Sequence, residues 1–265
     1  MVRFRLLGIP IGVHATFLFV ALLGATAYRG WDIAWWTVAA FVSILLHELG
    51  HALSARAFGS TGISVTLYGL GGVTTFSPGR AMTHGKSFLV SAAGSLVGIL
   101  AGSAVWYLAW AGVFDGAGRP VVVLVNSFVF TALVWGVLNW IPIVPLDGGH
   151  MVVHLVSIFN EERAPLVGQI LTWVSLAIIV PLAWINGYQF AVIILVMFAV
   201  AGLREYRDAT RERTRRAHVD TDSDEGVIRP DVIEPAPPTP SGDPMGGQSG
   251  RRSSSSPQDP PEFPI

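Results

Sequence analysis

The chain has 265 residues, of which 51% are hydrophobic and only 13% are charged. Soluble domains carry about 25% charged residues, so this composition excludes an ordinary soluble protein and indicates a membrane protein. Lys and Arg number 17, Asp and Glu 18, and the formal net charge is −1. The chain contains no cysteine, so any metal site has to use histidine and carboxylate ligands.

Six apolar stretches are candidates for transmembrane helices, which need about 20 apolar residues each. In chain order they cover about residues 13–28, 33–58, 88–111, 121–140, 166–185 and 188–203. The first is short, and residues 8–11 before it either extend it or lie at the membrane interface. Small residues are frequent in the third stretch and permit close helix contact in lipid. The fourth ends in a segment rich in proline and glycine, where we do not expect a regular helix.

The pattern changes between the second and third stretches. Residues 63–68 alternate apolar and polar side chains, the period of a half-exposed strand. Gly69, Gly71 and Gly72 interrupt this alternation, and residues 73–76 resume it. The sequence therefore predicts an α-helical polytopic membrane protein with about six transmembrane helices and a small membrane-associated β-hairpin or sheet.

Basic residues predict the orientation of the chain. Arg3 and Arg5 precede the first span, and a run of arginines follows the last: Arg204, Arg207, Arg211, Arg213, Arg215 and Arg216. Because cytoplasmic flanks are rich in Lys and Arg, we expect a multi-pass protein of the cell membrane with both termini in the cytoplasm. The second and fourth spans then run in the same direction, so their C-terminal ends meet on one side. We assign the arginines to topology and lipid headgroups and expect no nucleic-acid partner.

The sequence predicts two regions. Residues 1–203 form the membrane-embedded domain, and residues 204–265 form a basic juxtamembrane segment followed by a Pro/Ser-rich cytoplasmic tail that is disordered from about His218. Such a composition cannot bury enough apolar surface to offset the entropy lost on ordering. Nothing in the sequence indicates an oligomeric state.

One short motif carries candidate chemistry. His47 and His51 lie four residues apart in the second apolar stretch, so on a helix both imidazoles share a face and can bind one Zn²⁺. Glu48 follows His47 directly and can act as general base toward a water on that metal. Ionisable groups are costly at membrane depth, which makes this cluster a candidate functional site. A polar cluster that is merely satisfied between helices is the structural alternative.

A catalytic zinc site needs a third protein ligand. Asp147 is the best candidate, because it stands in the helix-broken segment at the same membrane side. Weaker candidates lie in the more polar connection that follows: Glu161, Glu162 and His154. Asn139 either satisfies freed backbone groups near Pro142 or lies near a substrate carbonyl. The remaining histidines are expected either at the membrane interface or in contact with a residue that binds the metal, and not as metal ligands themselves; they are His14, His84, His150 and His154. His150 is close in sequence to Asp147 and so could contact it.

Two motifs together carry a family resemblance: His47-Glu48-Leu49-Gly50-His51 and Asn139-x-x-Pro142-x-x-Pro145-Leu146-Asp147-Gly148-Gly149. They resemble the site-2 protease family of intramembrane zinc metalloproteases, over about residues 5–203. The resemblance implies His47, His51 and Asp147 as ligands of one Zn²⁺ per subunit, with Glu48 as catalytic base. It also implies regulated intramembrane proteolysis, in which transmembrane protein substrates are cut within the lipid bilayer near its cytoplasmic face.

The resemblance further implies that the β-rich stretch with Gly71 and Gly72 offers an edge to a substrate strand. One departure concerns the third span, where many family members carry Gly-Pro-x-x-Asn. This chain has Gly94-Ser95-Leu96-Val97-Gly98, which bears on substrate handling and not on metal binding. The alternative functions are a non-proteolytic membrane metal-binding protein or transporter and an inactive relative that only binds partners.

Overall fold

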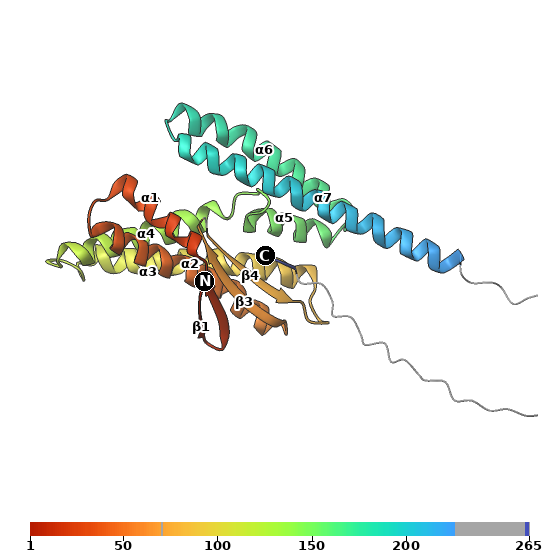
Figure 1. The fold of residues 1–265 in the computed structure, drawn as a ribbon, viewed down its shortest axis with the longest axis horizontal. Helices are drawn as coiled ribbons and strands as arrows, with labels where there is room; N and C mark the ends of the chain where they lie inside the picture. The colour runs from red at the N-terminus through yellow and green to blue at the C-terminus, as the bar shows by residue number, and fades with distance from the viewer. Residues whose placement is uncertain (70, 226–262, 265) are drawn as a thin grey trace, which may run out of the picture. The chain divides into compact units, whose positions relative to one another are not determined.

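The structure is a computed structural model that describes residues 1–69, 71–225 and 263–264. These residues form α-helices, one 3-10 helix and a five-stranded sheet (Figure 1). Contacts divide the chain into one unit of Met1–Asp208 with Pro261–Ile265 and another of Ala209–Pro260. All the functional residues predicted from the sequence lie in the first unit. In the second unit the structure describes residues 209–225, which are helical.

Four helices in the described part of the chain are long and apolar enough to cross a membrane. They are α2 (Asp32–Ala57), α3 (His84–Trp110), α4 (Arg119–Leu138) and α6 (Ala164–Ile185). At about 1.5 Å per residue, 20 residues cover the roughly 30 Å hydrocarbon core of a bilayer. The mainly helical membrane architecture with a small sheet is thus confirmed. By length and composition the structure supports four of the six predicted spans, the second to the fifth.

The first predicted span, about residues 13–28, is divided among three elements. Strand β2 (Ile9–Val13) ends where the span was expected to begin, and the 3-10 helix η1 (Ala15–Leu18) and α1 (Phe19–Ala27) follow. The cause is His14, whose backbone N–H donates to Leu67 O at 2.9 Å and so keeps this residue on the sheet. Its Nδ1 accepts from the Thr16 N–H at 3.3 Å and caps the 3-10 turn. The remaining helix is therefore too short to span a bilayer alone.

The last helix differs from the sixth predicted span in length. Helix α7 (Gln189–Glu225) contains that span and continues far beyond it. The predicted domain boundary between residues 203 and 204 falls inside this helix and stays a prediction. The helix also continues past His218, where the sequence predicts the start of the disordered tail. Residues 226–262 of that tail lie outside the described residues.

Helices α2, α3 and α4 pack against one another through glycines at their crossings. A Cβ added at Gly50 of α2 would lie 2.7 Å from the carbonyl oxygen of Ala93 in α3. A Cβ at Gly136 of α4 would lie 2.8 Å from Ile99 Cγ1, also in α3. Small residues allow such close backbone approach where lipid supplies no hydrophobic force between helices. The three helices consequently hold the second helix, with its two histidines, close to the third.

The sheet has the strand order β1-β2-β3-β4-β5 (Figure 1). Strands β3 (Thr61–Tyr68) and β4 (Gly71–Ser77) form the antiparallel hairpin predicted from the alternating pattern. Strand β1 (Val2–Leu6) pairs antiparallel with β2, which pairs parallel with β3. This N-terminal hairpin was missed, because residues 8–11 were assigned to the first span or the interface. Its Ile9 and Ile11 are buried in the same hydrophobic cluster as Val65 and Leu67 of the neighbouring strand β3.

Candidate metal centre

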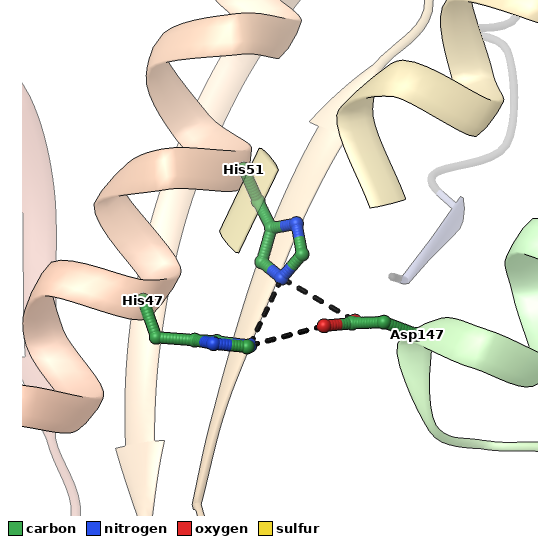
Figure 2. Close-up of side chains that lie close together, drawn as sticks. All are labelled: His47, His51 and Asp147. Atoms are coloured by element: carbon green, nitrogen blue, oxygen red, sulfur yellow. Dashed lines mark hydrogen bonds and ion pairs between the residues drawn. The ribbon is translucent and has the colours of Figure 1, made fainter. Parts of the chain in front are cut away.

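Three side chains from two helices converge on one point. His47 and His51 lie one turn apart on α2, and Asp147 is the first residue of α5 (Asp147–Ser157). Their metal-binding atoms all lie within 4.8 Å of one another. His47 Nε2 is 3.2 Å from Asp147 Oδ2, and His51 Nε2 is 3.3 Å from Asp147 Oδ1 (Figure 2). The predicted ligand set is therefore assembled in space, and all three residues are buried.

The donor set fits a zinc ion. The Nε2 atoms of His47 and His51 face each other at 3.2 Å, with the carboxylate of Asp147 as the third donor. Two imidazole nitrogens and one carboxylate are ligands that Zn²⁺ takes in catalytic sites, where the fourth position stays open. Among the described residues no other group of three or more histidines, aspartates or glutamates lies close enough together to bind one metal ion. Glu161, Glu162 and His154, the weaker candidates for third ligand, are outside this group.

Helix α3 orients two of the ligands. His51 Nδ1 lies 2.8 Å from the carbonyl oxygen of Val90, and because a carbonyl only accepts, Nδ1 carries the proton. The lone pair of Nε2 is then available to a metal. Ser95 Oγ donates to Asp147 Oδ2 at 2.9 Å. Such contacts fix the orientation of metal ligands, and sequence reasoning missed both of them.

Glu48 lies against the sheet. Its carboxylate Oε2 accepts a hydrogen bond from Thr74 Oγ1 of β4 at 2.8 Å, and the same hydroxyl is 3.1 Å from the Glu48 carbonyl oxygen. Gly72 packs on the same side chain, because a Cβ there would be 2.4 Å from Glu48 Cγ. Strand β4 thus sets the position of the predicted base. Thr74 was also missed, although the strand that contains it was predicted.

The proline- and glycine-rich segment places Asp147. Helix α4 ends at Leu138, and the N–H of Gly148 donates to the Asn139 carbonyl at 2.6 Å, which folds the segment back. A Cβ at Gly148 would lie 2.4 Å from Ile141 O, and one at Gly149 would lie 2.5 Å from Val144 N. Both glycines are needed for this close approach of backbone to backbone. The first turn of α5 is consequently held where its aspartate reaches α2.

All eight residues predicted for the site line one cavity of about 300 Å³. Besides the three ligands and Glu48 these are Asn139, His150, Gly71 and Gly72. Asn139 Nδ2 is 3.5 Å from His47 Nε2, and the backbone carbonyl of Asn139 accepts from Gly148 in the turn described above, so the role of the Asn139 side chain stays a prediction. The cavity is bounded on one side by β4 and on another by the segment before α5.

His154 lies farther along α5, and its ring packs near that of His84, with 6.4 Å between centroids. Burial is the largest cause that lowers the pKa of His154, and together with the neighbouring His150 and His84 it brings this pKa to about 4. Its imidazole is therefore neutral at pH 7. Its contact to α3 makes it part of the α3–α5 packing.

Comparison with known proteins gives matches over most of the chain. No family model matches the chain. It is 27% identical over 210 residues to zinc metalloprotease MJ0392 of Methanocaldococcus jannaschii, an alignment that covers 76% of this chain and 59% of that protein. It is 29% identical over 235 residues to Rip3 of Mycobacterium tuberculosis, also named as a zinc metalloprotease, with 78% and 59% covered. The chain thus spans less than two thirds of the length of these curated relatives.

A solved structure shares the fold. The site-2 protease from Methanocaldococcus jannaschii superposes with a TM-score of 0.58 at 24% identity, over 77% of this chain and 94% of that one. This match concerns the arrangement of the helices and the sheet.

The contact from Ser95 can be tested with a matched variant on the same helix. Ser95→Ala removes the donor to Asp147 and should weaken Zn²⁺ binding about 10–100-fold. Ser91, one turn earlier and equally buried, has a hydroxyl without a hydrogen-bond partner in the described structure, so Ser91→Ala should bind Zn²⁺ like the wild type. Competition with a chromogenic chelator in detergent measures both affinities. Equal affinities in the two variants would contradict the assigned role of Ser95.

Sequence, fold and site agree. The His47–His51 pair and the Asp147 segment match the family pattern, the structure brings them together, and the curated relatives that align with the chain are named as zinc metalloproteases. The fold is that of a solved site-2 protease. In its two motifs and in its fold the chain resembles the site-2 protease family.

Proposed function

We propose that the chain is an intramembrane zinc endopeptidase that hydrolyses peptide bonds of transmembrane protein substrates near the cytoplasmic face. The observation that carries this proposal is the buried convergence of His47, His51 and Asp147 beside Glu48 in one cavity. The cavity lies on a helix long enough to span a bilayer. Buried ionisable groups at such a depth are costly and are kept where they serve a function.

The residues have separate roles in this proposal. His47, His51 and Asp147 hold Zn²⁺, and Ser95 and the Val90 carbonyl orient two of them. Bound there, Zn²⁺ would polarise the scissile carbonyl and make water a strong nucleophile near neutral pH.

Glu48 moves the proton. Thr74 fixes Oε2 of Glu48, so we assign proton transfer to Oε1. That oxygen takes a proton from the attacking water and then delivers it to the amine nitrogen of the leaving segment. The water oxygen ends in the new carboxyl group, and the proton that Glu48 carried ends on the new amine.

Asn139 and the β4 glycines are assigned to the substrate. The Asn139 amide lies in the cavity near His47 and is placed to donate to a substrate carbonyl. Gly71 and Gly72 line the same cavity from β4, and without side chains they let an extended peptide approach the backbone. His150 also lines this cavity and is assigned to contacts near Asp147.

The membrane arrangement in the proposal has six spans, with both termini in the cytoplasm. Four are the helices described above, and the other two are the η1–α1 segment and the first part of α7. The arginines after residue 203 and those of β1 support this orientation. Residues 1–203 would be the protease domain and residues 204–265 the cytoplasmic juxtamembrane segment and tail. The substrate is then a membrane-spanning protein that is cut within the bilayer.

Glu48→Gln tests the proposed chemistry. It keeps the shape of the side chain but removes the base, so cleavage of a transmembrane substrate should fall by about 100-fold or more while zinc stays at one per chain. The matched control is Glu162→Gln, at an exposed glutamate of the α5–α6 connection. Reconstituted enzyme and a tagged substrate in proteoliposomes give the rate, and atomic absorption gives the zinc content. Undiminished cleavage by Glu48→Gln would overturn the mechanism.

Thr74 allows a finer test. Thr74→Val keeps the β-branched shape but removes the hydrogen bond to the Glu48 carboxylate, which for a charged group is worth about 1.5–3 kcal/mol. We expect kcat to fall about tenfold or more, with zinc content unchanged. Thr74→Ser retains the hydroxyl and should retain most of the rate. A Val variant as fast as the wild type, or a Ser variant as slow as Val, would show that Thr74 does not position the base.

A further inference from the structure

A short strand from the far end of the chain lies on the outer edge of β4. Strand β5 (Phe263–Pro264) pairs antiparallel with β4, with Phe263 opposite Phe76 and Pro264 opposite Thr75. On its other edge β4 pairs with β3. In the described part of the chain the ladder with β5 stops at Thr75, so the edge from Gly71 to Thr74 has no second partner there.

The same strand is the one that touches the predicted base. Gly72 and Thr74 both contact Glu48, and residues 71–73 line the cavity of the metal centre. Because β4 and β5 are antiparallel, a strand that runs in the sense of β5 passes from Phe76 toward Gly71. A longer peptide paired in this sense would therefore pass Gly72, next to Glu48. The edge that holds β5 leads directly to the metal centre.

Strand addition selects its partner weakly by sequence. An exposed edge presents a row of backbone N–H and C=O groups, and an added strand binds them with its own backbone. Two different segments that use one edge therefore exclude each other. The pairing of β5 is short, and Pro264 has no N–H to donate, so few hydrogen bonds have to be broken to displace it. A substrate segment that pairs along all of β4 would form more backbone hydrogen bonds with this strand than β5 does.

We propose that the outer edge of β4 is a docking surface for the chain's own segment around Phe263 and Pro264, and that this segment keeps an extended substrate off the same edge. Occupation of the edge makes the enzyme self-inhibited until a longer strand replaces the segment. The competition with substrate rests on the proposed proteolysis, whereas the docking of the segment does not. The segment belongs to the same unit as the sheet, which is consistent with a contact within one chain.

Cysteine cross-linking tests the docking directly, because the chain has no cysteine of its own. Thr75→Cys and Pro264→Cys together place two thiols at a paired position of the ladder, where Cβ atoms lie about 4.5–5.5 Å apart. The control combines Thr75→Cys with Ser254→Cys, ten residues earlier in the same tail. Both pairs are made in the full-length Glu48→Gln chain in membranes and are oxidised mildly.

The paired variant should form its disulfide about tenfold faster than the control, because its two thiols are held at a paired position of the ladder. A peptide with the sequence of a substrate's extended segment should slow the paired reaction and leave the control unchanged. Equal rates for the two pairs would overturn the docking. This outcome does not depend on whether the chain is a protease.

The competition is tested in the same Cys pair with Glu48 intact. The oxidised enzyme should cut a transmembrane substrate several-fold more slowly than the same enzyme after reduction, and the oxidised control pair should show no such change. Oxidised and reduced enzymes that cut at equal rates would overturn the inhibition. Loss of cleavage in every variant, reduced forms included, would instead contradict the proposed function and leave the cross-linking result to decide the docking.

Discussion

The fold depends on the cost of burying two imidazoles and one carboxylate in the apolar helix α2. An ionisable group without partners inside a membrane is expensive, so each needs a partner supplied by another element. The carboxylate of Asp147 comes from α5, the Val90 carbonyl and Ser95 hydroxyl from α3, and the Thr74 hydroxyl from β4. Three segments that are distant from α2 in sequence are therefore required to meet around one of its turns.

Missing side chains make this meeting possible. A Cβ at Gly94 would lie 2.2 Å from His51 Nε2, and one at Gly72 would lie 2.4 Å from Glu48 Cγ. The helix and the strand thus approach His51 and Glu48 with backbone that carries no side chain. Gly148 and Gly149 have the same function on the side of Asp147, where the chain folds back onto the end of α4. Glycine is favoured at these positions by close contact and not by flexibility, since most of them lie within helices or strands.

Local patterns predicted much of this arrangement. The four-residue spacing of His47 and His51, the family pattern around Asp147 and the alternation of β3 and β4 each depend on neighbouring residues. The residues that orient the metal ligands could not be predicted in this way, because they are distant from the ligands in sequence. A backbone carbonyl such as that of Val90 leaves no trace in a sequence, and Ser95 sits in a small-residue stretch that reads as packing. The parallel pairing of β2 with β3 joins residues more than fifty positions apart, so residues 8–11 were assigned to the first span or to the membrane interface and not to the sheet.

The edge of β4 connects the site to its regulation, since one strand positions the base, lines the cavity and carries β5. All of this depends on a zinc ion held by His47, His51 and Asp147. X-ray absorption at the zinc edge on the purified chain tests that claim most directly. The account predicts one zinc per chain with two imidazoles at about 2.0–2.1 Å, oxygen in the remaining positions, and loss of one imidazole in His51→Ala. A spectrum without imidazole scattering, or one that His51→Ala leaves unchanged, would contradict it.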